Sequence, residues 1–201
     1  TATTRVNPHL PYGYVESLEK QFSKEWRERY IDGSWDGFSG LIYKEFRDAP
    51  PFVVEPFEIP SDWFRFVAID HGYRNPTAVI WGAADYSGNI FIYDEFYESQ
   101  MRVSEIALAI KDKTKKQFIR MYLIDPSTAK DIGGEGKTIM AEFHENGIPV
   151  YPAKNQVEAG INKIHEYFNG PSLKIFSNCV RLRSQLQTYK YRDLRPSAKI
   201  D

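Results

Sequence analysis

The nine residues FRFVAIDHG, which run from Phe64 to Gly72, decide how the rest of the chain is interpreted. Five of the first six are apolar, a pattern typical of a β-strand that is buried on both faces of a sheet. Asp70 then falls where the strand leaves the sheet, and Gly72 allows a sharp turn close to a ligand. Because an unpaired buried carboxylate is costly, we expect Asp70 either to cap its loop or to bind a cation.

The segment after this strand alternates between strand and helix signals. We expect strands over 64–70, 77–84, 90–97, 121–124, 148–151 and 173–176, and helices over 103–116, 138–146, 157–168 and 180–188, with a last strand over 189–192. The turn Ser87-Gly88-Asn89 joins the second and third strands as a hairpin. Three antiparallel strands followed by parallel ones predict an α/β fold with a mixed sheet and helices on both faces.

A second apolar run, MYLIDPS from Met121 to Ser127, ends like the first. If its strand lies parallel to 64–70, Asp70 and Asp125 leave the sheet at the same edge. Two neighbouring carboxylates repel each other unless a cation lies between them. Mg²⁺ or Mn²⁺ suits such oxygen ligands, and a pair of these ions can support phosphodiester hydrolysis. The alternative is two independent loop caps.

The composition bounds the class of protein. The chain has 201 residues, of which 42% are hydrophobic, enough for one sizeable core. No apolar run is long enough to span a membrane. The single cysteine, Cys179, cannot form an internal disulfide, so we expect a reducing compartment and a buried thiol.

The net charge of −1 does not by itself suggest a nucleic-acid partner. Residues 151–201 nevertheless hold nine Lys and Arg against four Asp and Glu. This excess fits either a phosphate-binding face or an ordinary solvated surface. The candidate contacts to a DNA backbone are His71 beside the first acid, two lysines on the glycine-rich loop, and three basic residues further on: Lys130, Lys137, Lys154, Arg181 and Arg183.

Residues 1–60 look unlike the remainder. An amphipathic helix is expected over 14–30, an extended arm around Trp35, and a proline-rich stretch over 48–60 that lies against a neighbour. We therefore expect a linker over 1–60 and a domain over 61–201.

Four stretches of this sequence resemble one known family: FVAIDHGYRNPTAVIWGA, NIFIYDEFYES, MYLIDPS and ENGIPVYPAKNQVEAGINKI. They look like the nuclease domain of the terminase large subunits that package DNA in tailed phages, a domain with an RNase H-like fold. The resemblance runs from about Phe64 to Arg192. The earlier stretch ERYIDGSWDGFSGLIYKEF resembles the segment that joins the ATPase motor to the nuclease. No G-x-x-x-x-G-K-[ST] phosphate loop occurs in the sequence given, so the motor itself is not part of it.

The resemblance implies a set of site residues. Asp70 and Asp125 match the family's first two metal-binding acids, which would hold two Mg²⁺ or Mn²⁺ ions. The family's third ligand lies on a C-terminal helix. Asp201 stands at about the expected distance, but its context PSAKID does not match, so the domain could be truncated before this ligand.

The resemblance also implies a function. It predicts a metal-dependent endonuclease that cuts concatemeric double-stranded DNA at the start and end of genome packaging, in the cytoplasm of the infected host cell. Its partners would be the DNA backbone, the ATPase domain, the portal and the small terminase, with no membrane. Two alternatives stay open: another RNase H-like nuclease of the resolvase or transposase type, and a non-catalytic docking module of a packaging motor.

Overall fold

The computed structural model describes residues 40–130 and 138–190. The chain divides into two compact units, one formed by residues 1–44 and 186–201 and the other by residues 45–185. In the first unit Leu41 forms an isolated antiparallel bridge with Lys190, and Tyr43 stacks on Tyr189. The expected helix over 14–30, the Trp35 arm and residues 191–192 of the last expected strand lie outside the described residues, as do Lys137 and Asp201.

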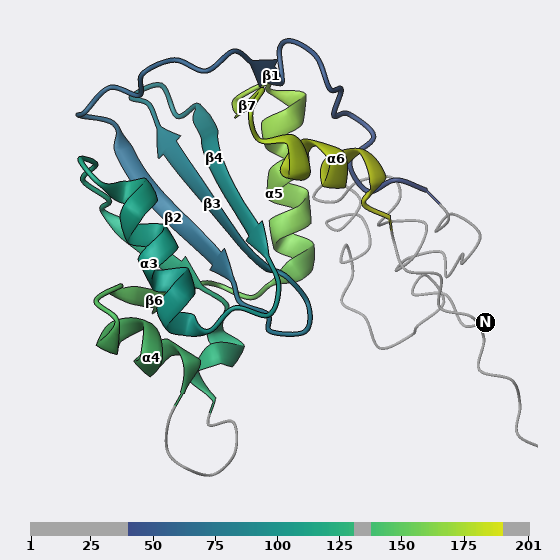
Figure 1. Cartoon of the computed structure of the whole chain (residues 1–201). Coiled ribbons are helices and arrows are strands. Elements are labelled where there is room, and N and C mark those ends of the chain that lie inside the picture. The colour runs from purple at the N-terminus through teal and green to yellow at the C-terminus, as the bar shows by residue number, and fades with distance from the viewer. Residues whose placement is uncertain (1–39, 131–137, 191–201) are drawn as a thin grey trace, which may run out of the picture. The chain divides into compact units, whose positions relative to one another are not determined.

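The second unit is built on a seven-stranded sheet with the order β1-β7-β4-β3-β2-β5-β6 (Figure 1). Strands β2, β3 and β4 pair antiparallel, and the remaining pairs are parallel. This confirms the predicted mixed sheet. The strands are β1 (Val53–Val54), β2 (Phe64–Asp70), β3 (Thr77–Ala84), β4 (Ile90–Glu98), β5 (Met121–Ile124), β6 (Val150–Pro152) and β7 (Leu173–Phe176).

Four α-helices and one 3₁₀-helix connect the described strands: α3 (Val103–Thr114), η3 (Pro126–Ala129), α4 (Ile139–Glu145), α5 (Val157–Asn169) and α6 (Val180–Thr188). Figure 1 shows α3 and α4 over the half of the sheet that contains β2, and α5 and α6 next to β4 and β7. Helix α4 begins after Thr138, whose hydroxyl accepts a hydrogen bond from the Ala141 amide, an N-cap contact. Among the described helices, none combines the length and apolarity that crossing a bilayer requires.

The main core lies between one face of the sheet and helices α3 and α4. The sheet contributes alternate residues such as Val67, Val79 and Trp81, and all three are fully buried. Ile106 of α3 and Phe143 of α4 pack against them and are equally buried. Residues two apart on a strand share a face, so the same pattern leaves the intervening residues for the other side of the sheet.

The expectation that β2 is buried on both faces is wrong. Val67 and Ile69 are buried against the helices, but Ala68 on the opposite face is only half-buried and Asp70 is exposed. An almost continuous apolar run suggests two covered faces, whereas here small side chains on one face line an open hollow. The uncovered face carries the candidate site.

Residues 45–63 pack onto the sheet at its other end. Strand β1, which the proline-rich sequence did not indicate, pairs in parallel with β7. Phe46 and Phe52 contact Phe168 of α5, with ring centroids 5.4 Å apart in each pair. A bidentate ion pair between Asp48 and Arg183 adds to these contacts, with N–O distances of 2.6 and 3.0 Å.

Candidate active site

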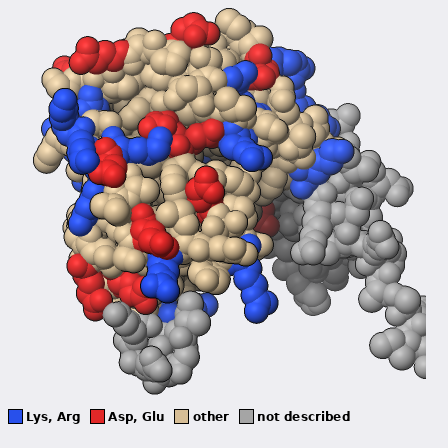
Figure 2. All heavy atoms as spheres, viewed as in Figure 1, with Lys and Arg blue, Asp and Glu red and all other residues tan. Residues whose placement is uncertain are grey.

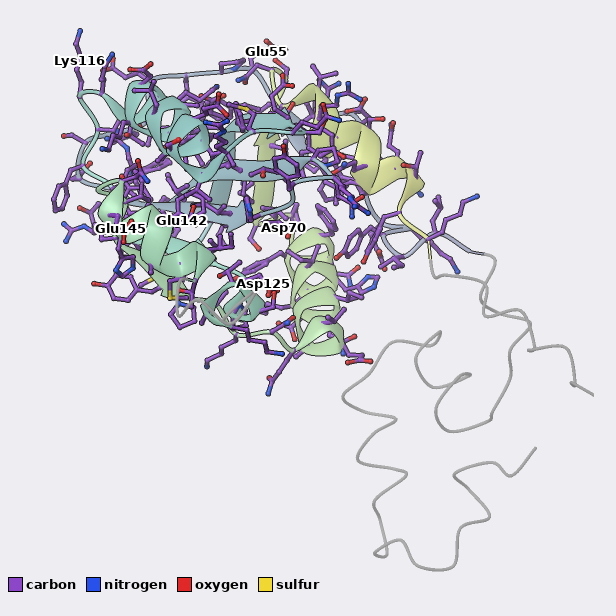
Figure 3. The ribbon with its side chains drawn as sticks, turned by 60° about the horizontal axis from the view of Figure 1, so that its bottom comes forward. Glu55, Asp70, Lys116, Asp125, Glu142 and Glu145 are labelled. Atoms are coloured by element: carbon purple, nitrogen blue, oxygen red, sulfur yellow. The ribbon has the colours of Figure 1, made fainter. Side chains whose placement is uncertain are left out.

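Asp70 and Asp125 leave the sheet side by side. Strand β2 pairs in parallel with β5, and Ile69 stands opposite Ile124. The next residue of each chain is an aspartate, and neighbouring strands lie about 4.8 Å apart. Figure 3 shows the two labelled carboxylates close together at this edge. The predicted adjacency of the two strands is confirmed, and it brings the two acids together.

The two carboxylates have different electrostatic environments. The pKa of Asp70 is raised, first by burial and then by the negative charge of Asp125, and the charge of His71 opposes this only in part. The pKa of Asp125 is lowered by hydrogen bonds from Ser127. Asp125 therefore loses its proton first, and Asp70 ionises beside an existing negative charge. Such a pair is stabilised by a cation.

The sequence Asp125-Pro126-Ser127-Thr128 orients the second acid. The Ser127 amide donates to Oδ1 of Asp125 at 2.7 Å, and the Thr128 hydroxyl donates to its carbonyl at 2.6 Å. Pro126 fixes the backbone at the start of η3, where its missing N–H costs nothing. One carboxylate oxygen is thus held by the chain, and Oδ2 makes no such bond among the described residues.

A buried threonine organises the turn after Asp70. The Thr77 side chain is fully buried, and its hydroxyl donates to the carbonyl of Gly72 at 2.8 Å. The same oxygen accepts from the Gly72 amide at 3.2 Å and lies 3.3 Å from Nδ1 of His71. A side chain at position 72 would come within 2.5 Å of the Asn75 carbonyl, so only glycine fits. The sequence analysis gave Thr77 no role.

A hollow of about 350 Å³ opens beside the acid pair on the uncovered face of the sheet. Its lining consists of small and aliphatic residues together with the two acids: Ala68, Ile69, Asp70, Ala78, Ile80, Leu123, Ile124, Asp125 and Ala153. The register places Ala78 directly opposite Asp70. Because a methyl group adds little height, a bulky ligand can approach the carboxylates closely.

His71 points into a different hollow. It lines a cavity with Tyr73, Arg102 and Glu142, and its ring meets Phe143 edge to face at 6.1 Å. Its pKa is lowered by burial, against the opposing charges of Glu142 and Asp70. The structure therefore separates His71 from the hollow that contains Asp70, although the two are adjacent in sequence.

The other candidate contacts to DNA lie in varied settings. Lys130 follows η3 and is exposed, and its charge contributes to the lowered pKa of Asp125. Lys154 is exposed beyond Ala153. The Arg183 guanidinium is taken up by Asp48 and by the carbonyl of Ser177. Arg181 lies over the ring of Tyr97, at 5.7 Å from its centroid.

The acids of β4 divide between the two faces. Asp94 pairs with Lys113 of α3 at 2.7 Å, and Glu95 accepts hydrogen bonds from the start of α6. Strand alternation predicts that such neighbours point to opposite sides. Within residues 40–130 and 138–190, no group of three or more His, Cys, Asp or Glu side chains is placed to hold a metal ion. Cys179 is buried as predicted, and burial raises the pKa of its thiol to about 12.

Fold and acid pair together define an RNase H-like nuclease domain architecture. A search of solved structures matches the nuclease domain of the phage P22 large terminase with a TM-score of 0.67, at 19% identity over 78% of this chain and 82% of that one. The large terminase of a thermophilic bacteriophage matches with a TM-score of 0.68, at 20% identity over 93% of this chain and 46% of that one.

In sequence, the chain is 24% identical to the terminase large subunit of Escherichia phage T5 over 196 residues. The match covers 94% of this chain and 43% of the T5 protein, so the chain spans less than half of that relative. No protein-family model matches. The resemblance to terminase large subunits is confirmed, and the fold is that of their nuclease domains.

The large terminase nuclease of another thermophilic phage, G20c, has been solved with bound zinc and with bound cobalt. The zinc form matches with a TM-score of 0.53, at 14% identity over 71% of this chain and 86% of that one. At these identities the likeness establishes the fold, and it assigns no metal to this chain.

Proposed function

We propose that this chain is the nuclease part of a terminase large subunit, a metal-dependent endonuclease that hydrolyses phosphodiester bonds of double-stranded DNA. The observation that carries the proposal is the adjacency of Asp70 and Asp125 on neighbouring parallel strands, beside an open hollow. The raised pKa of Asp70, caused by burial and by the charge of Asp125, supports it, because a cation between the two carboxylates would relieve their repulsion.

The residues present fit a hard divalent cation. Both candidate ligands are carboxylate oxygens, which Mg²⁺ and Mn²⁺ prefer, and the site faces solvent, so water can complete the coordination. Two bound ions would stabilise the attacking and leaving oxygens of the displacement. Asp201 is the proposed third ligand, and it lies outside the described residues.

The chain's own residues divide the remaining tasks. Asp70 and Asp125 bind the ions, and the bonds from Thr77 and Ser127 hold the two turns that orient them. The low floor at Ala68 and Ala78 lets a phosphate reach the carboxylates. Contacts to phosphates carry no sequence information, so we expect little sequence preference.

The proposed biological role is to cut concatemeric viral DNA when packaging begins and ends, in the cytoplasm of the infected cell. The names of the T5 relative and of the first thermophilic-phage protein, both large terminases, support a place within a packaging motor. The partners proposed for this chain are an ATPase domain, the portal and the small terminase.

The decisive experiment incubates the protein with supercoiled plasmid in Mn²⁺, in Mg²⁺ and in EDTA. Wild type should nick and linearise the plasmid only with the metals. Asp70→Asn and Asp125→Asn should each lose at least about 100-fold in rate, because loss of a direct ligand exceeds the usual effect of its supporting contacts. Asp94→Asn is the matched control and should keep wild-type activity, since Asp94 faces α3.

Cleavage that survives both site substitutions would exclude the two-carboxylate mechanism. If the folded wild type binds Mn²⁺ in calorimetry and never cleaves, a docking module is the better description of the chain.

A further inference from the structure

Glu95 fastens the start of helix α6 to strand β4. Its two carboxylate oxygens accept hydrogen bonds from the amides of Arg181 and Leu182, each at 2.8 Å. The first amides of a helix have no partner inside the helix, and a negative charge suits this end of its dipole. The contact therefore fixes where the first turn of α6 stands over the sheet.

The side chain that this anchor positions is that of Arg181. Its guanidinium carbon lies 5.7 Å from the centroid of the Tyr97 ring. Tyr97 pairs with Ala78, and Ala78 pairs with Asp70. Residues paired across strands share a face, so Asp70, Ala78 and Tyr97 form one row on the uncovered face. Two strand spacings of about 4.8 Å place the Tyr97 backbone about 10 Å from that of Asp70.

Arg181 has a charge to offer a ligand. Its side chain is exposed, and no carboxylate among residues 40–130 and 138–190 forms an ion pair with it. Arg183 on the same helix is already paired with Asp48. A guanidinium stacked on an aromatic ring keeps its N–H groups in the plane of the fork, where they can bind phosphate oxygens.

We infer that Arg181, held by Tyr97 and Glu95, binds a backbone phosphate of the DNA strand that reaches the acid pair. This inference rests on the proposed function. DNA carries one phosphate per about 3.4 Å of axis on each strand, so a separation of about 10 Å places this phosphate two or three nucleotides from the one at Asp70. Arg181 is thus a positioning residue, and it sets the register of the strand relative to the carboxylates.

The chain provides a close control for a test. Arg120 is also stacked on an aromatic ring, with its guanidinium carbon 5.5 Å from the centroid of Phe118. It precedes β5, whereas Asp125 follows that strand, so the two residues lie at opposite ends of it. Arg181→Gln and Arg120→Gln therefore remove the same charge and the same kind of stacking, one near the acid pair and one far from it.

The test measures binding of a short DNA duplex by fluorescence anisotropy in EDTA at several salt concentrations. Arg181→Gln should lower the affinity about 10-fold at low salt and reduce the slope of log K against log salt by about 0.9, the value for one lost phosphate contact. Arg120→Gln should match wild type. Equal effects of both substitutions, or none for Arg181→Gln, would overturn the inference.

Glu95→Ala separates positioning from overall charge. Removing a carboxylate should strengthen DNA binding if only net charge counts. If Glu95 positions Arg181, the variant should bind more weakly than wild type, and a melting curve should show that it is folded. Tighter binding by a folded Glu95→Ala protein would contradict the anchor role, and the Arg181 and Arg120 pair decides the case should this variant not fold.

These measurements are independent of cleavage. A contrast between Arg181→Gln and Arg120→Gln in a protein that never cuts DNA would leave the phosphate contact standing and remove the nuclease. Cleavage that depends on Asp70 together with wild-type binding by Arg181→Gln would do the reverse.

Discussion

At the scale of single residues, the two acids of the candidate site are chemically unequal. Asp125 is ionised first because hydrogen bonds from Ser127 stabilise its carboxylate and lower its pKa. Asp70 has a raised pKa because its carboxylate is partly removed from water and faces the charge of Asp125. Without a cation, the ionised form of Asp70 therefore destabilises the folded state, and this cost is expected of a group kept for function.

Asp70→Asn should consequently stabilise the metal-free protein at neutral pH. The neutral amide removes the repulsion, and the gain in Tm should be of the order of 1–2 °C because the group is partly exposed and screened. A carboxyl whose folded pKa is raised costs stability above that pKa. The gain should therefore disappear as the pH falls through the folded pKa of Asp70 toward its unfolded value. Thermal melts between pH 4 and pH 7 in EDTA measure this.

Asp125→Asn is the matched comparison and should not stabilise, because the lowered pKa of Asp125 means that its ionised form favours the folded state above the unfolded pKa. Added Mn²⁺ should raise the Tm of wild type and of neither variant. An Asp70→Asn protein that is less stable than wild type at pH 7 in EDTA would show that the repulsion does not govern this site.

Thr77 supports Asp70 through hydrogen bonds alone, so its role can be tested by a change that preserves shape. Thr77→Val leaves the amide and the carbonyl of Gly72 without their partner in a buried place. We expect a loss of about 2 kcal/mol in the free energy of unfolding, measured by urea denaturation, and weaker Mn²⁺ binding in calorimetry. Thr77→Ser keeps the hydroxyl and should restore Mn²⁺ affinity. Equal Mn²⁺ affinity in the valine and serine variants would exclude a positioning role.

At the scale of the elements, strong apolar periodicity predicted the described strands and helices of 64–188 in their observed order. Strand β2 begins and ends at the predicted residues, and so does β7. The face of β2 that stays open could not be read from its run of apolar residues, since a small residue such as Ala68 fits a core and a ligand hollow equally well. Strand β1 was missed because its two residues give no period and lie between prolines.

The segment 45–63 is structurally part of the sheet unit, and Phe46 tests this directly. Its side chain is 5% exposed and packs between Phe52 and Phe168. Phe46→Ala should lower the free energy of unfolding by about 3 kcal/mol, the usual result for a buried phenylalanine. Chemical denaturation followed by the fluorescence of Trp63 and Trp81, both in the sheet unit, measures this.

Phe118 provides the control, because the same substitution there removes a ring that is 70% exposed. Phe118→Ala should change stability by less than about 0.5 kcal/mol. If Phe46→Ala has an equally small effect, residues around position 46 behave as a linker that is dispensable for folding.

At the scale of the whole molecule, a chain with a net charge of −1 has no general attraction for DNA. Figure 2 shows basic and acidic side chains mixed over the face in view. DNA binding must then depend on local charges on the uncovered face, where Arg181 attracts phosphates and the acid pair repels them. Divalent ions would reverse the sign at the acid pair, so metal binding and DNA binding should be coupled.

The double variant Asp70→Asn/Asp125→Asn isolates this coupling. In EDTA at low salt it should bind duplex DNA several-fold more tightly than wild type, because two negative charges are removed where a phosphate is to lie. Adding Ca²⁺, used as a hard divalent probe, should tighten the binding of wild type and leave the double variant nearly unchanged, so that the difference between the two proteins closes. The affinities are measured by anisotropy with and without the ion. Equal affinity in EDTA would mean that DNA does not approach this edge of the sheet, and the nuclease proposal would then fail with its site intact.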